Sequence, residues 1–148
     1  MPSRALLAAA TCAAAATLTT AGPAQAVSPI QLGKIQYDSP GTDSRTNTSL
    51  NGEYVVIKNT GTTSRVLTGW TLRDASNHVY RFGTFTLGAG RTVVVRTGKG
   101  TNTASTRYWG SGNYVWNNTG DKAYLRASNG TSIDYCAWSS KGLGYKNC

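Results

Sequence analysis

The sequence predicts a small all-β domain, a sandwich or barrel built from about eight short strands. Apolar and polar side chains alternate in short runs, and turn-forming residues separate these runs at close intervals. No stretch keeps a 3.6-residue apolar period, so we expect helix content near zero. The chain shows neither a linker nor an internal repeat, and these observations together predict one domain.

Four strands are expected in the first half of the chain. In each of them, apolar residues recur at every second position and therefore lie on one face of a sheet. Their bounds and apolar pairs are Leu32–Tyr37 with Ile35 and Tyr37, Glu53–Asn59 with Val55 and Ile57, Leu67–Asp74 with Trp70 and Leu72, and Val79–Phe82 with Tyr80 and Phe82.

Four more strands are expected in the second half. The first contains Val93–Val95 and is the most apolar, and residues 98–112 after it read as a long polar loop. The last two strands are joined through Asn129-Gly130, a pair that supplies the positive φ of a tight hairpin. The bounds are Thr92–Thr97, Tyr114–Trp116, Lys122–Ala127 and Thr131–Tyr135.

The first 26 residues have the pattern of a secretory signal peptide. Arg4 precedes a run of Ala, Leu and Thr, and Ala24-Gln25-Ala26 provides the small-x-small cleavage pattern. We therefore expect cleavage after Ala26, a single domain over residues 27–148, and a secreted, extracellular product that is free or associated with the cell surface.

Cysteine usage agrees with export. Cys12 leaves with the predicted signal peptide, so Cys136 and Cys148 remain and are expected to form a disulfide. Two thiols and one histidine do not make up the four ligands of a zinc site. The sequence therefore predicts neither a metal site nor a cofactor.

The charge is strongly positive and uneven. The chain has 15 basic and 6 acidic side chains, and residues 54–148 hold most of the excess. A positive potential of this kind concentrates polyanions near a protein surface. Nucleic acid and anionic cell-wall polymer are therefore the first partners to consider, although the charge is also compatible with a role in solubility alone.

Several motifs occur in an order typical of one family. They are Glu53–Gly61, Leu67–Asp74, Tyr80–Phe82, Leu87 and Gly90 before Val93–Val95, Trp116–Asp121, Leu125, Gly130 and Ile133-Asp134. The matched elements run from about residue 32 to residue 136. This series resembles the lamin tail domain, including its exported bacterial members. The resemblance implies an immunoglobulin-like β-sandwich that serves in interaction or scaffolding. Coiled-coil heptads are missing, so filament assembly does not carry over.

The motif residues have structural explanations. Trp70, between a turn glycine and Leu72, is expected to anchor the core. His78, the only histidine, is accompanied by no Gly-x-Ser-x-Gly motif, no His-Glu pair and no phosphate-binding glycine loop. We therefore predict that the protein is not an enzyme, and a small hydrolase is the least favoured alternative.

Basic and aromatic residues alternate on one expected strand. If Ala123 and Leu125 enter the core, then Lys122, Tyr124 and Arg126 share the solvent face. Cations there would neutralise phosphates or carboxylates, and aromatic faces would stack on bases or sugars.

The expected loop 98–112 repeats this chemistry in Arg107, Tyr108 and Trp109. These residues, with Lys122, Tyr124 and Arg126, form the candidate ligand-binding set for a polyanion or a surface protein. The alternative of a carbohydrate-binding module is suggested by Tyr108, Trp109, Trp116 and Trp138. A third interpretation is that the basic side chains on the exposed strand only keep the protein soluble and discourage pairing of strand edges between molecules.

Overall fold

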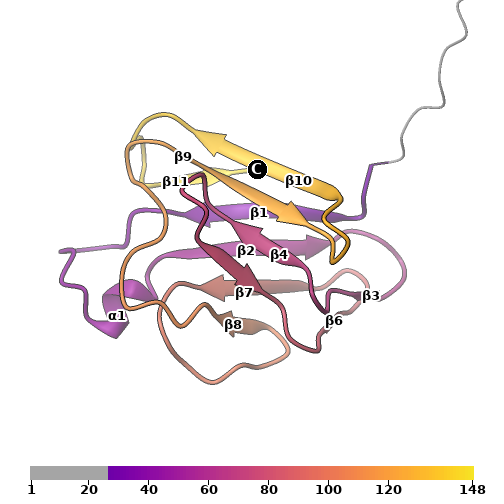
Figure 1. Cartoon of the computed structure of the whole chain (residues 1–148). Coiled ribbons are helices and arrows are strands. Elements are labelled where there is room, and N and C mark those ends of the chain that lie inside the picture. The colour runs from indigo at the N-terminus through magenta and orange to yellow at the C-terminus, as the bar shows by residue number, and fades with distance from the viewer. Residues whose placement is uncertain (1–26) are drawn as a thin grey trace, which may run out of the picture.

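The computed structural model describes residues 27–148 and shows two packed β-sheets with very little helix (Figure 1). The predicted signal peptide lies outside the described residues. Within residues 27–148, no helix is long and apolar enough to cross a membrane. The bounds are β1 Ile30–Gln36, α1 Asn47–Leu50, β2 Tyr54–Asn59, β3 Arg65–Val66, β4 Thr71–Arg73, β5 Val79–Arg81, β6 Thr86–Leu87, β7 Thr92–Arg96, β8 Thr106–Tyr108, β9 Asp121–Arg126, β10 Ser132–Trp138 and β11 Tyr145–Asn147.

Two main sheets form the sandwich. The five-stranded sheet has the order β11-β1-β2-β7-β8, and the four-stranded sheet has the order β10-β9-β4-β5. All pairings in them are antiparallel except β7 with β8, which is parallel. Strands β3 and β6 form a separate two-stranded ribbon. The architecture confirms the predicted all-β sandwich.

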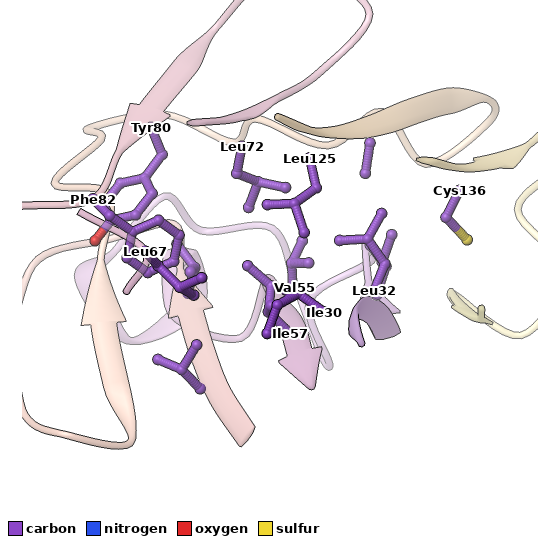
Figure 2. Packing of buried hydrophobic residues seen from close by; sticks show 14 of the residues in the cluster. Ile30, Leu32, Val55, Ile57, Leu67, Leu72, Tyr80, Phe82, Leu125 and Cys136 are labelled. Carbon is purple, nitrogen blue, oxygen red and sulfur yellow. The ribbon is translucent and has the colours of Figure 1, made fainter. Parts of the chain in front are cut away.

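The core lies between the two main sheets. Val55, Ile57, Val93 and Val95 of one sheet are buried, as are the inward residues of the other. Figure 2 shows the two sets facing one another, with Leu72 and Leu125 opposite Val55 and Ile57. Because every second residue of β2, β7 and β9 is buried, the alternation seen in the sequence decides which faces meet.

Two of the expected strands are wrong in extent or in kind. Only Thr71–Arg73 of the segment Leu67–Asp74 is a strand, because a turn precedes it in which Gly69 has a φ of 78°. Tyr114–Trp116 is not a strand at all. Its backbone N–H groups bind a buried carboxylate rather than a neighbouring strand.

Five short elements were not expected. Helix α1 is a single turn capped by the Thr46 side chain, which accepts a hydrogen bond from the backbone N–H of Ser49. Strands β3, β6, β8 and β11 contain only two or three residues each. Runs of this length are too short to show a period, so the sequence pattern carries no signal for them.

The Cys136–Cys148 disulfide is confirmed and connects the two sheets. The sulfur atoms are bonded, with the Cα atoms 5.9 Å apart. Cys136 belongs to β10 of the four-stranded sheet, whereas Cys148 follows β11, which pairs with β1 in the other sheet. The disulfide therefore holds the two sheets together at this end of the sandwich, in addition to the packing of the core.

The tryptophans are arranged differently from the prediction. Trp70 is only partly buried and packs against the edge of the core, so it is not the anchor. Trp116 and Trp138 are buried, and their ring centroids lie 6.1 Å apart. Trp109 meets Trp116 edge-on at 5.8 Å, and Trp138 stacks on Tyr37 at 4.6 Å. The aromatic centre of the domain is this group around Trp116.

We expect Trp116→Ala to lower the free energy of unfolding by about 3–5 kcal/mol, the usual cost of removing a buried large aromatic side chain. Trp70→Ala should cost about 1–2 kcal/mol, because less apolar area is lost from a partly buried site. Urea unfolding of the two variants and the wild type measures both values. A larger loss for Trp70→Ala than for Trp116→Ala would contradict this assignment of the aromatic centre.

Candidate functional site

The outer face of the four-stranded sheet carries the predicted basic strand. In β9, Ala123 and Leu125 are buried, and Lys122, Tyr124 and Arg126 point away from the core. Neighbouring strands add cations to the same face, because residues paired across strands project to the same side of a sheet. Arg73 of β4 pairs with Tyr124, and Arg81 of β5 pairs with Thr71.

These side chains form two rows across the strands. One row runs Arg81, Thr71, Arg126 over β5, β4 and β9. The next runs Val79, Arg73, Tyr124, Tyr135 and extends onto β10. Lys122 follows on β9, beside Ala137. Four cations and two tyrosines therefore share this surface, which we call the basic face: Arg73, Arg81, Lys122, Tyr124, Arg126 and Tyr135.

The tyrosine rings hold the cations in place. The guanidinium carbon of Arg73 and the ammonium nitrogen of Lys122 each lie 5.0 Å from the centre of the Tyr124 ring. Lys122 also lies 4.2 Å from the centre of the Tyr135 ring. Such contacts are favourable and restrict side chains that would otherwise move freely in solvent.

No carboxylate neutralises this face. The two ion pairs present within residues 27–148 join His78 to Asp74 and Lys141 to Asp38. The carboxylates in and beside the four-stranded sheet accept hydrogen bonds from other groups. Asp74 accepts hydrogen bonds from His78, while Asp121 and Asp134 accept them from backbone N–H groups. The cations therefore remain available to an anion from outside the domain.

The structure separates Arg107, Tyr108 and Trp109 from the basic face. Their segment is strand β8 with its flank and not a free loop, because it pairs with β7 at the edge of the five-stranded sheet. Arg107 pairs with the buried Val95 and therefore projects inward, where its guanidinium lies 4.3 Å from the centre of the Phe85 ring. The structure therefore does not bring these residues together with Lys122, Tyr124 and Arg126 on one surface.

Tyr108 and Trp109 are held by packing. The ring of Tyr108 lies against Gly100, where any side chain would collide with it. Trp109 contacts Tyr80 and Trp116 at centroid distances of 5.8 Å each. Trp116 and Trp138, the other aromatics of the carbohydrate alternative, are 2% and 9% exposed. The aromatic strip that this alternative requires does not form from these four residues.

His78 has a partner that the sequence did not reveal. Its Nδ1 lies 2.6 Å from Oδ2 of Asp74, whose side chain is buried. A triad would also need a nucleophile on the other ring nitrogen. Within the described part of the chain, no serine, threonine or cysteine bonds to Nε2 of His78. Asp74 also accepts the backbone N–H of His78, so the pair closes the turn before β5.

The most deeply buried acid is Glu53, at the start of β2. Its two oxygens accept hydrogen bonds from the Thr97 hydroxyl at 2.7 Å and from the backbone N–H groups of Val115 and Trp116 at 3.0 Å. Burial raises the pKa of Glu53 to about 7, against the opposing effect of these three donors. All of its partners within residues 27–148 are a hydroxyl and backbone groups of the scaffold, so we assign it a structural role.

Among residues 27–148, no group of three or more His, Cys, Asp or Glu side chains lies close enough to hold an ion.

Comparison with known proteins adds one finding. Residues 23–140 match the family model of the Lamin Tail Domain. A search of curated proteins gives no match.

Because folding raises the pKa of Glu53 from 4.5 to about 7, the native state binds more protons than the unfolded chain between these values. This contribution to stability is fully present below pH 4.5 and is lost as the pH rises through 7. At about 1.4 kcal/mol per unit, the loss amounts to about 3 kcal/mol. Urea unfolding from pH 4.5 to 8 measures it, with Glu53→Gln as the control that lacks the titrating group. Parallel curves for the two proteins would contradict the assignment.

Proposed function

The chain belongs to the lamin tail domain family, and we propose that it is an exported binding module that takes polyanions on the basic face. The family is a non-catalytic, immunoglobulin-like interaction domain, which supports a binding role over a hydrolytic one. The pattern of residues 1–26 supports export, and the Cys136–Cys148 disulfide is compatible with an oxidising compartment. The ligand class is argued from the face itself.

One observation carries the proposal: Arg73, Arg81, Lys122 and Arg126 share one sheet surface and have no carboxylate partner within the described residues. A face that only kept the protein soluble would more often mix charges of both signs. Here the cations stand on three neighbouring strands, and adjacent strands lie about 5 Å apart. Thr71 lies between Arg81 and Arg126, and Arg73 lies in the next row, so the cations are spread over the face and can meet more than one phosphate of a polyanion.

The rigidity of the face also supports the proposal. The cations are mounted on a sheet whose opposite side is the core, and tyrosine rings lie against Arg73 and Lys122. Side chains that are already ordered lose less entropy when they bind. Extracellular nucleic acid and anionic cell-wall polymer both fit these requirements, because both present closely spaced phosphates on a flexible backbone.

Binding of a single-stranded oligonucleotide should weaken steeply with salt, because each neutralised phosphate releases condensed counterions. Four cations predict a slope of about −3 in a plot of log K against log salt concentration, at roughly 0.7 per phosphate of a single strand. Fluorescence anisotropy at several salt concentrations measures it. Replacing Arg73, Lys122 and Arg126 together by Gln should reduce the slope to about −1.

A matched control removes three cations from other surfaces. Arg65, Arg91 and Lys99 are exposed and lie outside the basic face. Their joint replacement by Gln lowers the net charge equally and should leave the slope nearly unchanged. An equal loss of binding in both triple variants would show that only net charge matters. A slope near zero for the wild type would reject polyanion binding.

A further inference from the structure

The basic face contains a hollow of about 240 Å³ at its β5 side. Three of its lining residues are the arginines Arg73, Arg81 and Arg126, and Thr71 and Ser128 add two hydroxyl groups. The arginines come from three neighbouring strands, with Thr71 between Arg81 and Arg126 in the same row. A small anion in the hollow would therefore meet guanidinium groups from three directions.

Two of the arginines are fixed by hydrogen bonds that leave most of their donors free. Nη1 of Arg73 donates to the Asn77 side chain at 3.2 Å, and Nη1 of Arg81 donates to the Gly69 carbonyl at 2.9 Å. A guanidinium group carries five N–H donors, so each of these side chains is oriented without being saturated.

Unpaired donors lie beside the hollow. Nε of Arg73 and Nε of Arg126 are shielded from solvent and have no hydrogen-bond partner within the described chain. Because these two nitrogens are shielded, the donors available to an anion in the hollow are the remaining Nη groups of the arginines. The hollow thus combines unused guanidinium donors with an excess of positive charge.

We propose that this hollow binds one phosphate monoester group. Its three positive charges suit an anion of charge near −2, which a monoester carries at pH 7. The tetrahedral group offers three terminal oxygens to three guanidinium forks, whereas a carboxylate offers two oxygens in one plane. A phosphodiester inside a polymer has one negative charge and fewer free oxygens. The hollow therefore favours the phosphorylated end of a chain.

This inference rests on the proposed polyanion binding. It also gives the bound polymer one orientation on the basic face. With a terminal phosphate between Arg73, Arg81 and Arg126, the rest of the polymer can run along β9 past Tyr124 to Lys122. The inner phosphates then meet the remaining part of the basic face. A polymer that carries a terminal monoester should accordingly bind more tightly than the same polymer without it.

The test uses the purified protein and two labelled single-stranded oligonucleotides of one sequence, with and without a 5′-phosphate. We expect the phosphorylated form to bind at least about tenfold more tightly. Inorganic phosphate should remove this preference by competition. A hexose 6-phosphate should compete better than inorganic phosphate if the natural ligand is a hexose phosphate of a wall polymer. It should compete no better if the natural ligand is the phosphorylated end of a nucleic acid.

The key variant replaces Arg73, Arg81 and Arg126 together by Lys. It preserves charge but removes the planar forks, so it should lose the preference for the 5′-phosphate and retain the salt slope. Thermal unfolding checks that the variant folds, and the Arg65→Lys, Arg91→Lys double variant serves as the control.

The outcomes separate the two proposals. Equal affinity for both oligonucleotides, or a preference that survives in the triple-lysine variant, would overturn the monoester site and leave polyanion binding standing. If inorganic phosphate abolishes the difference in affinity between the two oligonucleotides, the result supports the monoester site. If neither oligonucleotide binds but inorganic phosphate shifts the backbone amide signals around Arg126, the hollow stands and polymer binding fails. Absence of both kinds of binding rejects both.

Discussion

The buried carboxylate of Glu53 is the constraint on which the organisation of this domain depends. It joins β2, the end of β7 and the segment before β9, because its partners are Thr97, Val115 and Trp116. That segment forms no strand, so the carboxylate replaces the ladder that would otherwise hold it. Fixing the backbone at Trp116 places its ring against the rings of Trp109 and Trp138. Removing the acid would thus release both a loop and the aromatic centre.

The interior and the basic face are two sides of the same strands. Ala123 and Leu125 face the core, which fixes the direction of Tyr124 between them. The antiparallel register then brings Arg73 beside Tyr124 and Thr71 beside Arg126. Charge that is scattered along the sequence is collected on one surface in this way. The family supplies the sandwich, and the side chains that the register places on its outer face decide the chemistry of that surface.

The sequence predicted the features that depend on local alternation, including the class of fold, most strands and the outward direction of Lys122, Tyr124 and Arg126. It could not predict register, so Arg73 and Arg81 were missed although both were in expected strands. It also could not predict which tryptophan is buried. Trp70 lies between a turn glycine and Leu72 and therefore had the clearer pattern of a core residue. Trp116 is instead held in the core by Glu53, an acid far away in the sequence. Arg107 was misplaced because a three-residue strand leaves no periodic signal.

The position of β11 has a consequence for how the chain reaches its native state. β11 comes from the last residues, yet its partner β1 comes from the first described strand. The five-stranded sheet therefore cannot be completed before residue 147 has been synthesised. Contacts between such distant segments slow folding, since a long loop must close before they form. Until then the edge of β1 that pairs with β11 stays open, and the Cys136–Cys148 bond cannot form.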